Sequence, residues 1–165
     1  MLYQVAAMVG EANQAEIRLN QMREALNAIQ NATVNFKRRP KIYFEEWDEP
    51  RISCIRWVSE LISLAGGDDC FPELAKMPMG KDRIIADDQM IVERAPDIII
   101  GSWCGKKFRA EKICQRPGWQ DVPAVKNNQL FEIKSADILQ PGPAALTDGV
   151  AQLHQIVLQW QSKHA

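Results

Sequence analysis

The chain has 165 residues, a formal net charge of -1 from 20 basic and 21 acidic side chains, and 46% apolar residues. This length and composition fit one domain with a hydrophobic core and argue against disorder. The balanced charge gives no electrostatic basis for binding nucleic acid or an anionic membrane. No apolar run approaches the roughly 20 residues that cross a bilayer, and the amino terminus does not look like a secretory signal.

Residues 2–31 are predicted to form one long helix. Its apolar side chains recur at alternating steps of three and four, which makes a narrow stripe. The members of this stripe are Val5, Met8, Ala12, Ala15, Leu19, Met22, Leu26 and Ile29. The stripe favours a surface helix that lies across a globular body, and it also fits the seam of a coiled coil between two copies. Residues 31–40 end the helix, and the basic triplet at 37–39 is interpreted as a solvated turn.

The next segment changes character within a few residues. A buried strand is predicted at 41–44, followed by a loop that carries Glu45, Glu46, Trp47 and Asp48. A helix at 53–65 comes next, and Gly66-Gly67 would end it with a left-handed cap. In open α/β sheets, ligands bind at loops beyond the carboxyl ends of the strands. The acidic loop is therefore the first place to look for function.

The remaining elements alternate between short helices and short strands. In chain order they are a helix at 88–94 capped by Asp87 or Asp88, a strand at 97–101, a loop at 102–105, a helix at 106–114, strands at 122–125 and 130–133, and a terminal helix from 141 onward. This alternation predicts an α/β fold whose mostly parallel sheet is flanked by helices. Trp57 and Trp160 are predicted to be core residues, and Trp119 to anchor a loop.

The cysteines and histidines do not form a metal or redox motif. Cys54, Cys70, Cys104 and Cys114 lack CxxC spacing and are interpreted as buried free thiols. His154 and His164 fall on different faces of the predicted terminal helix. The sequence also shows no Ser-His-Asp or Cys-His set. We therefore predict a protein without a metal or cofactor of its own and without enzymatic activity.

Several stretches together carry a resemblance to a known family. They are the long first helix, PKIYFEEWDEPRIS, IRWVSELISLAGG, IVERAPDIII with its Trp-Cys-Gly loop, PAVKNNQLFEI and PGPAALTDGVAQLHQIV. The chain resembles the C-terminal lobe of the periplasmic substrate-binding proteins of ABC importers, in the subgroup that binds vitamin B12, iron-siderophore and haem-type chelates. In that family one long helix bridges two α/β lobes. The resemblance implies a connecting helix at 1–36 and the C-terminal lobe at 40–165.

The resemblance also implies a ligand site at the strand ends that face the other lobe. The residues implied to line it are Glu45, Glu46 and Trp47 from the first strand, Trp103, Cys104 and Gly105 from the second, and Arg83. Indole rings give a flat chelate a large contact area at low entropic cost, and polar groups fix its orientation. The implied ligand is cobalamin or a similar metal chelate, which the lobes would hold between them.

The family pattern further implies partners and a compartment. Asp87 and Asp88 lie where the family presents a surface acid to its membrane permease. A family member would also have a first lobe and a signal peptide ahead of the long helix. The resemblance implies the periplasm, whereas the sequence as it stands would indicate the cytoplasm if it were complete.

Two alternatives from other functional classes are open at this point. The apolar stripe of the first helix could pair two chains, which would make the protein a homodimeric interaction module. The carboxylates of Glu45, Glu46 and Asp48 could instead serve a small α/β enzyme.

Overall fold

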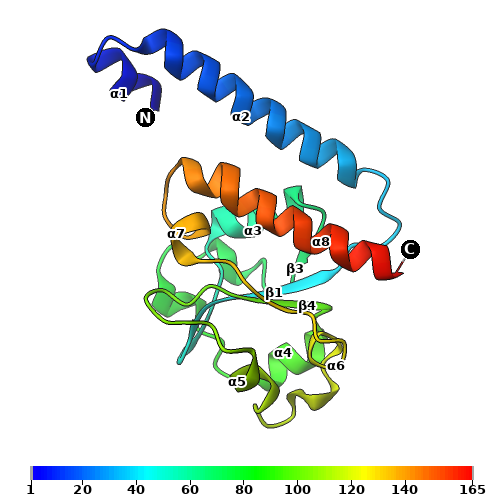
Figure 1. The fold of residues 1–165 in the computed structure, drawn as a ribbon. Coiled ribbons are helices and arrows are strands. Elements are labelled where there is room, and N and C mark those ends of the chain that lie inside the picture. Colours follow the sequence, from blue (N-terminus) through cyan, green and yellow to red (C-terminus); the bar gives the residue numbers. More distant parts are fainter. Residues whose placement is uncertain (1, 165) are drawn as a thin grey trace.

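The structure is a computed structural model, and it describes residues 2–164. Helices and one sheet form layers (Figure 1). The longest helix, α2 (Ala12–Thr33), lies outside a layer that contains α3 (Arg56–Leu64) and α8 (Val150–His164). The sheet comes next, and α4 (Gln89–Arg94), α5 (Ala110–Cys114) and α6 (Pro123–Lys126) lie on its other side.

The sheet has five strands, and its spatial order differs from the chain order. The strands are β1 (Lys41–Asp48), β2 (Arg51–Ser53), β3 (Asp68–Asp69), β4 (Ile98–Gly101) and β5 (Leu130–Glu132). The main order is β2-β1-β4-β5, and β3 also pairs with β1. All neighbouring pairs are parallel except β1 with β2. The predicted α/β fold with a mostly parallel sheet and flanking helices is confirmed.

Alternation along the strands divides the interior into two cores. Ile42 and Phe44 of β1 pack with α3 and α8, whereas Tyr43 packs on the opposite face with α4, α5 and α6. Successive side chains of a strand point to opposite faces, so a strand covered on both sides is apolar throughout. Trp160 is confirmed as a core residue, whereas Trp57 is only half buried. Trp119 is fully buried in the second core.

The prediction of one continuous helix over residues 2–31 is wrong. The helix breaks after α1 (Leu2–Met8), and α2 begins at Ala12. Gly10 adopts a φ of +80°, and the Glu11 amide donates a hydrogen bond to the carbonyl of Ala6. A glycine in this conformation ends the helix, because glycine lacks a Cβ and adopts a positive φ without steric cost.

The break redirects the apolar stripe. From Ala15 onward the stripe faces the body of the chain, and Leu26 and Ile29 pack against the first core. Val5 and Met8, on α1, are instead mostly exposed. The part of the apolar stripe that lies on α2, which could have paired two chains, thus faces the body of the chain itself.

The basic triplet after α2 is solvent-exposed at Lys37 and Arg38, as predicted, but its two arginines also make tertiary contacts. The Arg38 guanidinium lies 2.7 Å from Asp97 and stacks over the Trp160 ring at 5.0 Å. Arg39 donates hydrogen bonds to Asp68 at 2.8 Å and to the carbonyls of Ser63 and Gly67. These contacts attach the carboxyl end of α2 firmly to the rest of the fold.

Several shorter elements also differ from expectation. Residues 45–48 continue strand β1 instead of forming a loop, and the segment at 122–125 is not a strand but the start of α6. Pro123 occupies the first turn of α6, where a missing amide hydrogen costs nothing. Residues 106–109 precede α5 instead of belonging to it.

The other described elements are short turns. They are η1 (Leu74–Lys76), η2 (Gly80–Arg83), η3 (Trp119–Asp121), α7 (Ser135–Ile138) and the π-turn η4 (Ala145–Gly149), which continues into α8. Among residues 2–164, no helix combines the length and the apolar character needed to span a membrane.

Candidate ligand-binding site

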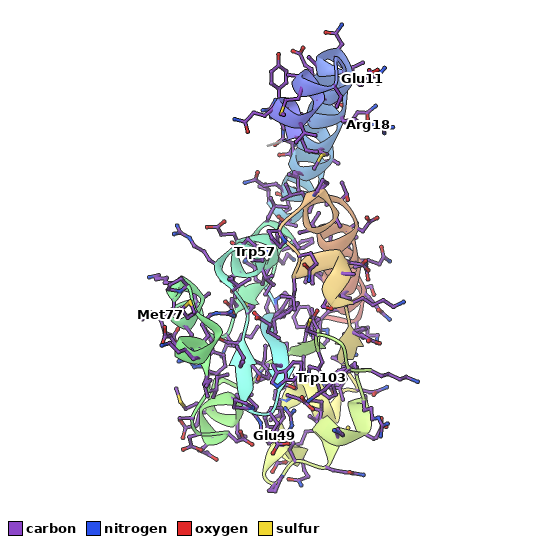
Figure 2. All side chains as sticks on the ribbon, turned by 90° about the vertical axis from the view of Figure 1, so that its left-hand side faces the viewer. Glu11, Arg18, Glu49, Trp57, Met77 and Trp103 are labelled. Atoms are coloured by element: carbon purple, nitrogen blue, oxygen red, sulfur yellow. The ribbon has the colours of Figure 1, made fainter. Side chains whose placement is uncertain are left out.

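The candidate site lies at the carboxyl ends of β1 and β4. These strands are parallel neighbours, with Phe44 opposite Ile100 and Glu45 opposite Gly101, so they end at the same edge of the sheet. The β1–β2 turn and the loop at 102–109 extend from this edge. Figure 2 shows Glu49 and Trp103 at this end of the molecule, far from Glu11 and Arg18 on the amino-terminal helices. This is the edge at which open α/β sheets bind ligands.

A β-bulge shapes the end of β1. Glu45 pairs with Ser53 and Trp47 pairs with Ile52, so one extra residue, Glu46, stands between two consecutive residues of β2. A bulge bends the strand and changes which way the following side chains point. Trp47 is therefore half exposed at the strand end, although Tyr43 and Glu45 before it are buried.

The structure places Glu45 in the interior, and its predicted position on an exposed loop is wrong. Glu45 is 0% exposed. Its carboxylate accepts hydrogen bonds from Arg116 at 2.6 and 2.8 Å, from the Tyr43 hydroxyl at 2.9 Å and from the Trp103 indole at 2.9 Å. Because a carboxylate bears two acceptor oxygens, these four donors leave it little capacity for a ligand.

Trp103 is likewise buried, at 4% exposure, instead of lying open to a cleft. Its ring packs edge-on against Phe108, with 5.1 Å between the ring centroids, and its indole nitrogen is occupied by Glu45. A side chain buried in this way cannot offer its face to a chelate as the structure stands. The sequence prediction also missed Arg116, because the chain carries no local motif that links it to a residue 71 positions earlier.

Burial and ionic contact both shift the pKa values of the groups that surround Glu45. Burial, strengthened by the adjacent Glu45 carboxylate, raises the pKa of Tyr43 well above its usual value. Burial alone would lower the pKa of Arg116, but its hydrogen bonds and attraction to Glu45 outweigh this effect and raise that pKa. The cluster therefore holds a neutral phenol and a charged guanidinium across the ordinary pH range.

Glu46 and Arg83 form a second ion pair at the bulge. The Arg83 guanidinium, 2% exposed as a residue, donates to the two Glu46 oxygens at 2.6 and 3.2 Å and also to the Ser53 carbonyl. Arg83 thus lies behind Glu46, and only Glu46 reaches the surface. Arg83 was predicted to contact the ligand directly. In the structure it instead orients and neutralises Glu46.

Trp47 and Asp48 share one lysine. The Lys106 ammonium lies 4.1 Å from the centroid of the Trp47 ring and 2.8 Å from Asp48, and Lys112 approaches the same carboxylate at 3.7 Å. Burial alone would raise the pKa of Asp48, but the hydrogen bond and charge of Lys106 bring that pKa below its usual value. Asp48 is therefore ionised and committed to these lysines.

A pocket of about 410 Å³ opens at this edge. Its volume falls within the range typical of small-molecule sites. The residues that line it are Glu46, Trp47, Pro50, Ile52, Cys104, Leu139 and Gln140. Of the predicted ligand residues, the structure brings Glu46, Trp47 and Cys104 together here. Gly105 follows Cys104 with a φ of +71°, which aids the turn of the loop.

A second, larger pocket lies elsewhere. This apolar groove has a volume of about 560 Å³, and it lies between the amino-terminal helices and the segment before α8. Leu2, Leu19 and Met22 line one side, and Trp57 and Leu146 are among the residues on the other. The groove is remote from the strand ends, and Figure 2 shows Trp57 close to the α2 side of the molecule.

The two candidate docking acids have different environments. Asp87 is exposed, and its side chain accepts a hydrogen bond at 2.9 Å from the amide of Gln89, the first residue of α4. Asp88 lies 2.7 Å from Arg51 and is only partly exposed. Asp87 is thus the acid whose charge has no arginine partner among the described residues.

The cysteines divide into two groups. Cys54 and Cys70 are buried, as predicted, whereas Cys104 and Cys114 are exposed, and all four are free. Burial, with a contribution from Asp69, raises the pKa of Cys70 to about 12. Within residues 2–164, no group of three or more His, Cys, Asp or Glu side chains could hold a metal ion.

Comparison with known proteins identifies the family. The model of the periplasmic binding protein family matches residues 1–136. This chain belongs to the periplasmic binding protein family. A search of curated proteins found no match. The sequence-based prediction of the family is therefore confirmed.

Solved structures with the same fold support this conclusion. A possible iron-binding periplasmic solute-binding protein from Staphylococcus epidermidis has a TM-score of 0.77 at 17% identity, over 94% of this chain and 59% of its own. S. aureus IsdE, solved in complex with heme, has a TM-score of 0.72 at 18% sequence identity. The match covers 94% of this chain and 62% of IsdE. The vitamin B12 binding protein BtuF of Vibrio cholerae has a TM-score of 0.60 at 20% sequence identity. The match covers 92% of this chain and 54% of BtuF. This chain thus spans little more than half the length of these relatives.

Proposed function

We propose that this chain acts as the C-terminal lobe and connecting helix of the solute-binding component of an ABC importer. In this proposal residues 1–36 connect two lobes, and residues 40–165 form one wall of the ligand site. The solute is a metal chelate with a flat apolar face, such as cobalamin, haem or an iron-siderophore. The protein would work in the periplasm and deliver the solute to a membrane permease.

One observation carries the proposal: the pocket beyond β1 and β4 has Trp47 in its wall. A partly exposed indole at a strand end offers contact area that a flat ligand can use. Glu46 beside it is held in place by Arg83, so a polar group of fixed position accompanies the ring. Convergence of an aromatic surface and a few positioned polar groups is the usual composition of a small-molecule site.

The geometry also explains why a second lobe is needed. The pocket is an open concavity on one surface, so a bound chelate would keep its other side in water. A partner lobe that covers this side would bury the rest of the ligand and raise affinity. The Arg38 and Arg39 contacts fix the end of α2 on this lobe, which favours limited motion between lobes.

The three carboxylates proposed for an enzyme do not support that alternative. Glu45 is buried against Arg116, Glu46 is paired with Arg83, and Asp48 is paired with Lys106. A general acid or base must exchange a proton with a substrate, and these carboxylates are engaged by cationic side chains instead. Solute binding accounts for the arrangement better.

The ligand site can be tested with two tryptophan variants. We expect Trp47→Ala to weaken binding of cyanocobalamin, hemin or a ferric siderophore about tenfold or more, because an anchoring indole is lost. Binding would be measured by isothermal titration calorimetry with the chain alone and with a first lobe supplied.

Trp57→Ala is the matched control, because Trp57 is also half buried but lines the apolar groove. Loss of affinity in Trp57→Ala with none in Trp47→Ala would move the site to the groove. No binding of any chelate under either condition would refute the proposed function.

We further propose that Asp87 contacts the permease. Its charge is exposed and free of an arginine, as a docking acid requires, whereas Asp88 is occupied by Arg51. Asp87→Asn keeps an acceptor oxygen for the Gln89 amide and removes only the charge. We expect this variant to bind its reconstituted permease about fivefold more weakly.

The exposed Asp82 supplies the control for docking, as Asp82→Asn. Equal permease affinity for the wild type and Asp87→Asn would exclude the docking role of Asp87.

A further inference from the structure

The loop that follows β4 is strongly cationic. Together with the first turn of α5, the segment from Cys104 to Lys112 carries Lys106, Lys107, Arg109 and Lys112 against the single acid Glu111. All four basic side chains belong to exposed residues. The whole chain has a net charge of -1, so this concentration is local and not a property of the composition. A local excess of one sign attracts ligands of the opposite sign.

Acids near this loop do not cancel its charge. Glu45 and Glu46 of β1 are neutralised from inside by Arg116 and Arg83. Asp48 is shared between Lys106 and Lys112, and the neighbouring Glu49 lines a surface hollow with Lys112. Among residues 2–164, Lys107 and Arg109 make no ion pair with any acid. The segment is therefore left with a positive surplus.

Packing fixes the loop in place. Phe108 is almost buried and packs against Trp103, which Glu45 holds through its indole nitrogen. Gly101 allows this approach, because a Cβ at that position would lie 2.2 Å from the Phe108 ring. The cationic side chains thus extend from a well-anchored support, which lowers the entropy lost when they meet a ligand.

Lys106 connects the cationic loop with the pocket. Its ammonium lies above the Trp47 ring, and Trp47 lines the pocket. An ammonium has three donor hydrogens, and the contact with Asp48 uses one of them. The Lys106 side chain is 45% exposed, so its other donors can reach a group that rests beside the indole.

We propose that the ligand of this site is an anionic metal chelate, whose negatively charged oxygens bind Lys106 and the neighbouring Lys107 and Arg109 while its flat part rests on Trp47. This inference depends on the proposed function and narrows its ligand class. A chelate without net negative charge, such as cyanocobalamin, would leave the cations unused. Carboxylates on a macrocycle and iron-bound catecholates both carry such oxygens, and the experiment separates them.

Two matched pairs of probes test the charge directly. Hemin and its dimethyl ester share one macrocycle, but only hemin carries free propionates. A ferric catecholate complex is an anion, whereas a ferric trihydroxamate is neutral. We expect the wild-type chain to bind the anionic member of at least one pair about tenfold more tightly than the neutral member. The pair that shows the difference identifies the source of the charge.

Lysine variants then locate the contact. Lys106→Gln should weaken the preferred anionic probe about fivefold and leave its neutral partner unchanged. Lys126→Gln is the control, because Lys126 is also an exposed lysine in an ion pair, 2.9 Å from Asp121. The anionic probe should also lose affinity as ionic strength rises from about 0.01 to about 0.15 M, because the screening length shortens.

The outcomes separate this inference from the proposed function. If neutral probes, including cyanocobalamin, bind as tightly as anionic ones, the inference is wrong and the solute-binding role stands. If Lys106→Gln and Lys126→Gln behave alike, Lys106 does not recognise the ligand and the inference also fails. If none of the probes binds, either to the chain alone or with a first lobe supplied, the proposed function is refuted together with the inference.

Discussion

Replacing Arg116 by methionine should lower the free energy of unfolding by about 3–5 kcal/mol, as removal of one partner from a buried ion pair does. Arg116 donates two hydrogen bonds to Glu45, at 2.6 and 2.8 Å. Without it, Glu45 would remain 0% exposed with only the neutral donors Tyr43 and Trp103. An unpaired carboxylate in the interior is costly. Urea denaturation monitored by circular dichroism measures the change.

Two further variants test whether the stability lost in Arg116→Met comes from the unpaired buried charge. Arg56→Met removes an exposed pair with Glu60, at 3.1 Å, and should cost only about 0.3–0.5 kcal/mol. The double variant Glu45→Leu with Arg116→Met removes both charges and should recover much of the lost stability. If Arg116→Met were no more destabilised than Arg56→Met, the ion pair would not contribute as its burial indicates.

Trp160→Ala should also destabilise the fold by about 3–5 kcal/mol, the usual loss for a large buried aromatic side chain. Trp160 is 1% exposed in the first core, and its outer face carries the Arg38 guanidinium. The substitution would leave a cavity and loosen the attachment of α2. Hydrogen exchange should therefore show faster exchange at the carboxyl end of α2, in addition to a lower urea midpoint.

Leu158→Ala provides the matched control on the same helix. Leu158 is 37% exposed, so its truncation should cost much less, within about 1 kcal/mol. If Trp160→Ala and Leu158→Ala lowered the free energy of unfolding equally, the assignment of the Trp160 side of α8 to the core would be wrong.

The framework of the fold could be predicted because its strands and long helices carry strong patterns. The continuous apolar runs at 42–44 and 98–100 indicate strands covered on both faces, which is how both lie. The segment at 122–125 was misassigned because two valines suggest a strand, whereas Pro123 starts a helical turn. A run of four residues has too little periodicity to separate the two.

The site was harder to predict, because it depends on contacts between distant parts of the chain. Alternation from Tyr43 already places Glu45 on the same buried face, and this signal could have corrected its assignment to a loop. The partner of Glu45 could not be found in this way, because Arg116 lies in a segment without a motif. Trp47 was predicted on a loop beyond the strand, whereas it lies within β1, and the bulge at Glu46 explains why it is partly exposed.

The bulge at Glu46 has a consequence for engineering this protein. It separates the buried Glu45 from Glu46 and Trp47, which are partly exposed and line the proposed ligand pocket. A library that varies only Trp47, Pro50 and Cys104 could alter what the pocket accepts, since it leaves every buried ion pair intact. In the proposed function, solute preference and folding are thus encoded in adjacent but separable stretches of one strand and its neighbouring loop.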